Sequence, residues 1–165
     1  MAQIVPPEGI TAENYTATYD QSPTTVGLHT VTLTGTGAYT GTIQLTYEVY
    51  LKKGHTYTAK GYCYRLTKRN TVTVTGAFNQ KKKKVVIANT INLGGRTCKV
   101  TAVGKKAFSG WKRLQRVTIG KNVTKIGAKA FAGDRKLKKI SFRGNKIPKI
   151  GRQAFVKINK NAKFS

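Results

Sequence analysis

Cationic side chains recur at a fixed interval in the C-terminal part of the chain, where they could form a binding surface for anions. Arg116 and Lys139 lie 23 residues apart, and Lys99, Lys125 and Lys149 recur ahead of a Val-Gly or Ile-Gly pair. If the repeated segments stack as strands, these side chains point outward in columns about 5 Å apart. The like charges in such columns repel one another, which is unfavourable unless salt or an anionic partner screens them. We therefore take all five as candidate ligand-binding residues; the alternative is a solvated surface that only keeps the protein soluble.

The residues that catalysis and metal binding require are scarce. Beyond residue 50 there is one carboxylate, Asp134, so that part of the chain has no carboxylate pair for acid–base or glycosidase chemistry. Two histidines, His29 and His55, and two cysteines, Cys63 and Cys98, are too few and too scattered for a zinc site. Neither the phosphate-binding loop motif nor the Gly-x-Ser-x-Gly motif occurs. We predict a non-enzymatic protein without a metal or a cofactor.

The two cysteines leave two alternatives open. In an exported protein Cys63 and Cys98 could form a disulfide. However, strand alternation places Cys98 on the same face as Val100, whereas Cys63 lies on the face opposite its neighbours Tyr62 and Tyr64. Two such positions need not meet.

The charges divide the chain into two parts. Residues 1–50 contain four acids and no Lys or Arg, so their net charge is −4. Residues 51–165 contain all 31 basic residues and a single acid, so their net charge is +30. This contrast predicts two units. We expect a β-domain at 1–51, a hinge and β-hairpin at 52–84, and a repeat region at 85–165.

The elements that position these residues are predicted to be strands. Segments 15–19, 28–34 and 42–49 alternate apolar and polar residues with a period of two, which predicts a half-buried antiparallel sheet. Segments 61–66 and 71–75 flank a short polar turn and are predicted to form a hairpin. The whole chain is therefore expected to be mostly β.

The C-terminal part is an internal repeat. Phe108, Phe131 and Phe155 lie 23 and 24 residues apart, and each follows a Gly-x-x-Ala segment. A period in the low twenties with Leu-x-x-Ile strands is typical of a leucine-rich-repeat solenoid, in which stacked units share one core. We expect glycine to permit a sharp backbone turn and Ala-Phe to begin a short helical turn. The lysine run Lys81–Lys84 is expected to lie outside the repeated strands.

The N-terminal part resembles bacterial immunoglobulin-like β-domains. Segment 26–43 begins with Val26-Gly27, continues as a β-run, and ends in glycine-x-glycine-alanine-tyrosine-x-glycine-threonine. Domains of this kind, found in tandem on bacterial surface proteins, close with a similar pattern in which asparagine stands at the position of Ala38. The resemblance covers residues 14–50 and implies part of such a domain, with an exposed sheet edge.

Residues 85–158 resemble the BspA-like leucine-rich repeats of bacterial surface proteins. The family unit is isoleucine-glycine-x-x-alanine-phenylalanine, a small residue and glycine, followed by leucine-x-x-isoleucine-x-isoleucine. Segments 103–119 and 126–142 fit this unit, although Trp111 and Asp134 stand where the family usually has cysteine. Val156-Lys157-Ile158 departs from it and suggests a terminal cap. The resemblance implies an extracellular, cell-wall-associated protein that serves adhesion or ligand binding.

We therefore expect a surface module that binds an acidic polymer, such as teichoic acid, a glycosaminoglycan or mucin, or a host protein. One alternative is a nucleic-acid-binding protein, in which Tyr62, Tyr64 and Trp111 would stack on bases, although no nucleic-acid-binding motif supports it. Trp111 itself either packs on a neighbour or forms an exposed platform for a sugar or a base. Another alternative is a filament subunit that self-associates through strand edges. No apolar run is long enough to span a membrane, and a signal peptide and anchor are expected outside these residues.

Overall fold

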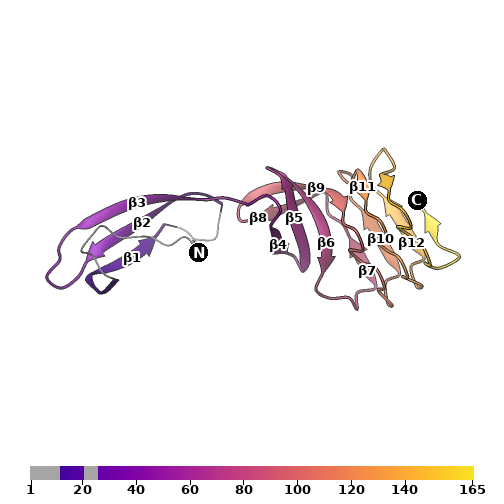
Figure 1. The fold of residues 1–165 in the computed structure, drawn as a ribbon, viewed down its shortest axis with the longest axis horizontal. Coiled ribbons are helices and arrows are strands. Elements are labelled where there is room, and N and C mark those ends of the chain that lie inside the picture. Colours follow the sequence, from indigo (N-terminus) through magenta and orange to yellow (C-terminus); the bar gives the residue numbers. More distant parts are fainter. Residues whose placement is uncertain (1–11, 21–25) are drawn as a thin grey trace. The chain divides into compact units, whose positions relative to one another are not determined.

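The chain forms two compact units, Met1–Tyr50 and Leu51–Ser165. The structure, a computed structural model, describes residues 12–20 and 26–165 (Figure 1). Within these residues the protein is mostly β, as the sequence predicts.

The first unit is a three-stranded antiparallel sheet with the order β1-β2-β3. A short 3-10 helix (Ala12–Asn14) leads into β1 (Tyr15–Tyr19), and β2 (Gly27–Gly35) and β3 (Thr42–Val49) follow. The alternation in the sequence located all three strands. On β2 the alternate residues His29, Val31 and Leu33 are buried, whereas the intervening Thr32 keeps partial solvent access. One face of this sheet therefore carries the apolar side chains.

The second unit is built from eleven strands, most of them short. They are β4 (Thr56–Ala59), β5 (Tyr62–Lys68), β6 (Thr71–Ala77), β7 (Lys84–Val86), β8 (Thr90–Leu93), β9 (Arg96–Val103), β10 (Arg116–Ile119), β11 (Lys125–Ile126), β12 (Lys139–Phe142), β13 (Lys149–Ile150) and β14 (Lys163–Phe164).

These strands form two sheets on different sides of a solenoid (Figure 1). One sheet has the order β14-β12-β10-β7 and is parallel throughout. The other has the order β13-β11-β9-β6-β5-β4, with β8 paired to β9. Its strands β4, β5 and β6 form an antiparallel meander, and β6 joins the parallel repeats through β9. The predicted hairpin at 61–66 and 71–75 thus lies in the same sheet as strands of the repeats.

The turns that begin the three repeats at Val103, Ile126 and Ile150 form a third ladder. Lys106, Phe108 and Gly110 donate their backbone N–H groups to the carbonyls of residues 128, 130 and 132, at 3.0, 2.8 and 2.9 Å. The same pattern joins the second repeat to the third.

The expected helical turns are not formed in these segments, which are hydrogen-bonded turns instead. Two features prevent a helix. Alternate N–H groups bond to the next repeat rather than within their own segment, and Lys106, Lys129 and Gln153 adopt left-handed φ values of 55°, 56° and 57°. A right-handed helix cannot continue through a left-handed residue.

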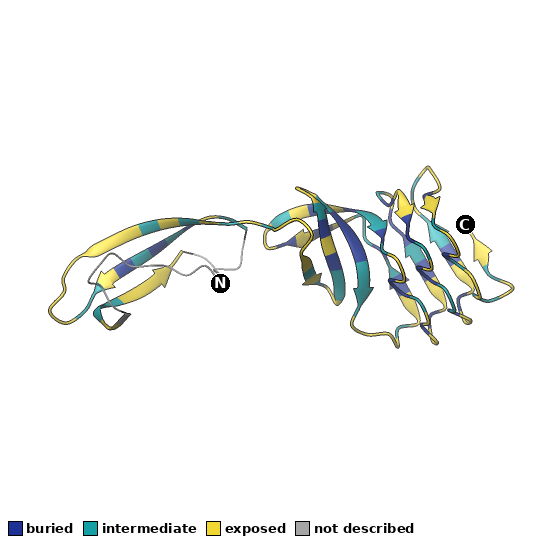
Figure 2. Ribbon diagram, in the orientation of Figure 1, coloured by how far each residue is buried: buried dark blue, intermediate teal, exposed yellow. Residues whose placement is uncertain are grey.

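The core is a column of aromatic rings that runs through the repeats. Phe108 stacks on Phe131 with ring centroids 5.4 Å apart, and Phe131 stacks on Phe155 at 5.3 Å. Phe164 closes the column with its ring edge-on to Phe155. Figure 2 shows buried and exposed residues alternating along the repeat strands, with the buried ones contributing to this core.

The glycine that follows each apolar residue at the start of a repeat has a different role from the one expected. Gly127 does not adopt a left-handed φ, so it is not required for a sharp turn. A Cβ atom at Gly127 would lie 2.6 Å from backbone atoms of Gly104 and Lys105. Glycine is therefore required there because successive repeats approach each other closely.

Candidate functional site

Four cationic residues stand in register on the four parallel strands of one sheet. Arg116 of β10 is paired with Lys139 of β12, as the sequence predicts. The column continues at both ends, because Lys84 of β7 pairs with Arg116 and Lys163 of β14 pairs with Lys139. All four side chains are exposed. We call Lys84, Arg116, Lys139 and Lys163 the strand column.

The sequence reasoning missed both ends of the strand column. It placed the run Lys81–Lys84 outside the repeated strands, and this is wrong for Lys84. Lys84 lies 32 residues before Arg116, because β8 and β9 are inserted between them, so the regular interval of 23 or 24 is lost. The sequence does contain a local similarity that would have placed Lys84 in the column. Segments 84–87 and 116–119 both begin with a cation that is followed by an apolar strand.

The second predicted column is shorter than expected. Lys125 of β11 pairs with Lys149 of β13, and both are exposed. Lys99 does not join them, because Lys125 pairs with Ala102 in β9, whereas Lys99 pairs with Thr90 of β8 and Thr71 of β6. The reason is register: Val103 aligns with Ile126, so the residue before Val103 occupies the column position.

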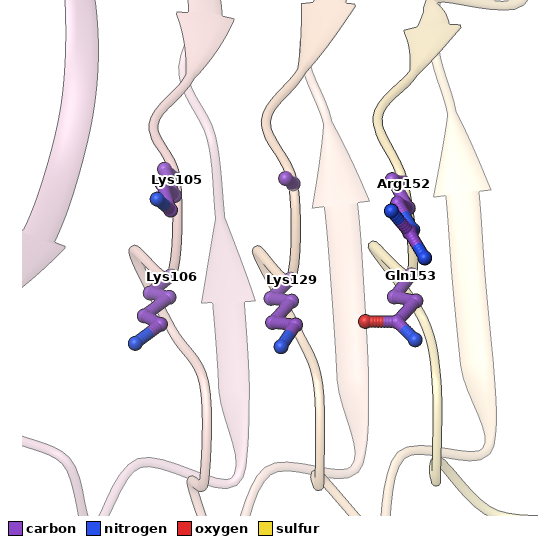
Figure 3. A pocket seen from close by; sticks show the side chains of 6 residues that line it. Lys105, Lys106, Lys129, Arg152 and Gln153 are labelled. Atoms are coloured by element: carbon purple, nitrogen blue, oxygen red, sulfur yellow. The ribbon is translucent and has the colours of Figure 1, made fainter.

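A third cationic group lies on the turns and was not predicted. Lys105, Lys106, Lys129 and Arg152 line a hollow together with Ala128 and Gln153 (Figure 3). These six residues occupy the two variable positions of Gly-x-x-Ala-Phe in three consecutive repeats. A count of charges at those two positions would have revealed the group, because four of the six are cationic. We call it the turn hollow.

The described residues supply no side-chain counterion to these cations. Within residues 12–20 and 26–165, no Lys or Arg side chain forms an ion pair. The one acid of the second unit, Asp134, is fully buried, and its Oδ1 accepts a hydrogen bond from the Trp111 backbone N–H at 2.8 Å. Burial raises the pKa of Asp134 to about 7, against the opposing effect of backbone N–H groups of Trp111 and Gly110. The exposed surface of the described second unit therefore carries many cationic side chains and no acidic side chain.

The aromatic side chains that a base-stacking surface would use are mostly buried. Trp111 is 3% exposed and meets the Phe108 ring edge-on at 5.2 Å, so it packs on a neighbour and offers no platform. Tyr64 is also 3% exposed. Tyr62 keeps partial solvent access and lies under the Lys82 ammonium group at 4.7 Å. Two of the three rings on which the nucleic-acid alternative relied are thus inaccessible.

The two cysteines are free thiols. Cys63 lies on β5 and Cys98 on β9, and β6 runs between these strands. Two strand spacings amount to about 9.6 Å, which exceeds the separation that a disulfide can bridge. Burial raises the pKa of the Cys98 thiol, which keeps it protonated.

Neither a metal-binding cluster nor a membrane-spanning helix occurs among the residues that the structure describes. They contain no group of three or more His, Cys, Asp or Glu side chains arranged to hold a metal ion. They also contain no helix with the length and apolar character needed to cross a membrane.

Stacked short parallel strands, a repeated Phe column and a period of 23 or 24 residues define a leucine-rich-repeat solenoid. Residues 88–165 match the family described as the BspA type leucine rich repeat region (6 copies). The resemblance of the repeats to this family is thus confirmed for that segment. No curated protein matches the chain.

Solved structures include similar proteins. A leucine rich cell surface protein from Faecalibacterium prausnitzii A2-165 is 30% identical, with a TM-score of 0.57 over 65% of this chain and 30% of that one. A leucine-rich repeat protein from Bacteroides ovatus ATCC 8483 is 21% identical, with a TM-score of 0.49 over 66% of this chain and 36% of that one. One from Bacteroides capillosus ATCC 29799 is 19% identical, with a TM-score of 0.46 over 67% of this chain and 98% of that one. The chain thus spans about a third of the length of the first two structures.

Proposed function

We propose that this chain is a non-enzymatic bacterial cell-surface module that binds an acidic polymer outside the cell, in association with the cell wall. Teichoic acid, a glycosaminoglycan and a mucin-type glycan are the polymers of suitable charge. The strand column carries this proposal, because it places four exposed cations in register and the described second unit has no exposed acidic side chain to neutralise them. The similarity to a cell surface protein supports the location. In the same proposal, residues 14–50 form part of an immunoglobulin-like β-domain.

The strand column suits a linear anion better than a compact one. Neighbouring strands are about 4.8 Å apart, so three intervals give a column about 14 Å long across the strands. A polymer that runs along the solenoid axis therefore meets one cation on each strand. Each neutralised anionic group releases condensed counterions, and this makes binding strongly dependent on salt and only weakly dependent on sequence.

Charge reversal in the strand column tests the proposal. The variant Arg116→Glu/Lys139→Glu/Lys163→Glu is compared with a matched control that also reverses one arginine and two lysines, Lys53→Glu/Lys68→Glu/Arg69→Glu. The three control residues are exposed and lie outside the strand column and the turn hollow. Each triple variant therefore has the same net charge, and only the placement of the reversed charges differs.

Binding of heparin and of duplex DNA is measured by fluorescence anisotropy over a series of salt concentrations. For duplex DNA the slope of log K against log salt is about −0.9 per phosphate contacted. We expect the column variant to lose about 2–3 units of that slope and the control to lose less than one. Equal losses would mean that only diffuse charge acts, and would refute an organised column. A strong preference for one DNA sequence or strand form over heparin would favour the nucleic-acid alternative instead.

A further inference from the structure

The turn hollow is a second cationic site, separate in the fold from the strand column. It lies on the turns that begin the repeats, whereas the strand column lies on the sheet formed by β7, β10, β12 and β14. In Figure 3, Lys106, Lys129 and Gln153 occupy the same level of three successive turns, and Lys105 and Arg152 share the neighbouring level. The hollow is open to solvent and has a volume of about 540 Å³, which is within the range of small-ligand sites.

The backbone fixes the directions of these side chains. Lys106, Lys129 and Gln153 share nearly the same left-handed φ of 55–57°, so their side chains leave the backbone in the same direction in each repeat. The spacing is held by hydrogen bonds from the Lys106 N–H to the Ala128 carbonyl at 3.0 Å and from the Lys129 N–H to the Arg152 carbonyl at 3.1 Å. Because the backbone is fixed in this way, the entropic cost of binding a ligand falls on the side chains and not on the backbone.

Ala128 makes the site concave. It occupies the position that Lys105 fills in the preceding repeat and Arg152 in the following one. Its methyl group leaves space between the two long cationic side chains, which stand two repeats apart. Lys106 and Lys129 border the same space on the neighbouring level. The floor is thus small and apolar, and the surrounding groups are three ammonium groups and one guanidinium group.

We infer that the turn hollow binds a tetrahedral oxyanion carried on a saccharide, that is, a sulfate or phosphate ester of a sugar unit. The ester would lie over Ala128, where Arg152 can offer paired N–H donors and the lysines can offer ammonium groups. The sugar ring would cover the alanine methyl group and the lysine methylene chains. This inference rests on the proposed function in one respect: the ester is a unit of the acidic polymer that the module would bind.

The inference is tested by NMR titration of the isotope-labelled full chain with glucose 6-sulfate and with glucose 6-phosphate. Glucose and glucuronate serve as the neutral and the carboxylate controls. We expect saturable shifts in the amide signals of Ala128, Lys129 and Arg152 with the two esters, and at least tenfold weaker binding of both controls. The ester that binds more tightly shows whether the hollow prefers a sulfate or a phosphate group. Non-saturable shifts spread over the whole basic surface would overturn the site.

Two variants separate an organised hollow from general charge. Ala128→Leu fills the floor without changing the net charge, and we expect it to weaken ester binding at least tenfold. The matched control Asn145→Leu adds the same side chain at an exposed position outside the hollow, and we expect a change of less than twofold. Equal affinities of the two leucine variants would overturn the inference.

Two double variants that remove the same charge provide a second test, in case Ala128→Leu does not fold. Lys105→Gln/Arg152→Gln should weaken ester binding at least tenfold, whereas Lys121→Gln/Lys160→Gln should weaken it less than twofold, because both control lysines are exposed outside the hollow. If heparin binds the wild-type chain normally but the sugar esters give no saturable binding, the turn hollow is overturned and the proposed function stands. If the esters bind but no polyanion does, the proposed function fails and the turn hollow stands.

Discussion

The buried carboxyl group of Asp134 should make the stability of the second unit fall as the pH rises. Asp134 is 0% exposed, and its Oδ1 accepts the Trp111 N–H at 2.8 Å. Within the described part of the chain, no group donates a hydrogen bond to its Oδ2. An ionised oxygen without a partner is costly in an apolar environment. The perturbation is Asp134→Asn, which keeps an oxygen acceptor for Trp111 and removes the ionisation.

The magnitude follows from the pKa, which burial raises from 3.8 to about 7. Between these two values the folded chain holds a proton that the unfolded chain has released. The free energy of unfolding therefore decreases as the pH rises through this window, by about 1.4 kcal/mol per pH unit. Between pH 5 and pH 8 the expected loss is about 3 kcal/mol, most of it complete by pH 7. The asparagine variant should lack this loss.

Urea unfolding at pH 5, 6, 7 and 8 measures the effect, with fluorescence of Trp111 as the probe. Trp111 is the single tryptophan, so the signal reports the second unit alone. Every other titratable group is common to both proteins, so its contribution cancels in the difference. The amide leaves an unsatisfied N–H in place of Oδ2, which costs about 1–3 kcal/mol at every pH. The informative quantity is therefore how the difference in free energy of unfolding between the wild-type chain and Asp134→Asn changes with pH.

Parallel pH profiles for the wild-type chain and Asp134→Asn would refute the reasoning. Such a result would mean that Asp134 stays ionised in the folded protein throughout the window, with solvent or a nearby cation reaching its carboxylate. A difference that grows with pH in favour of the wild type would contradict the sign of the shift.

Three further outcomes test the fold. Phe131→Ala should cost about 3–5 kcal/mol, because it removes the fully buried central ring of the column, whereas Lys129→Ala should cost less than about 0.5 kcal/mol; equal thermal shifts would disprove the repeat register. Gly127→Ala should cost about 1–3 kcal/mol, since its Cβ would lie 2.6 Å from the preceding repeat, and an unchanged urea midpoint would contradict that close approach. Chymotrypsin should cut first after Tyr50, which is 70% exposed at the end of the first unit; protection there, followed by mass spectrometry, would argue against a hinge.

The sequence determined the solenoid, because each repeat must bury the same positions. Phe108, Phe131 and Phe155 recur in register, so their stacking follows from the period alone. The same period places Arg116 beside Lys139. The division of charge near residue 50 is also a property of the sequence, and the boundary between the two compact units falls at the same point in the chain.

Only the tertiary structure decided which other cations come together. Lys84 joins Arg116 across an insertion that breaks the regular interval, and Lys99 pairs with Thr90 and Thr71 instead of standing beside Lys125. The turn hollow depends on left-handed residues whose conformation is held by hydrogen bonds between repeats. Spacing along a chain predicts contacts where the repeat length is constant. Where the length changes, the partner is chosen by strand pairing and packing in three dimensions, which a single repeat does not encode.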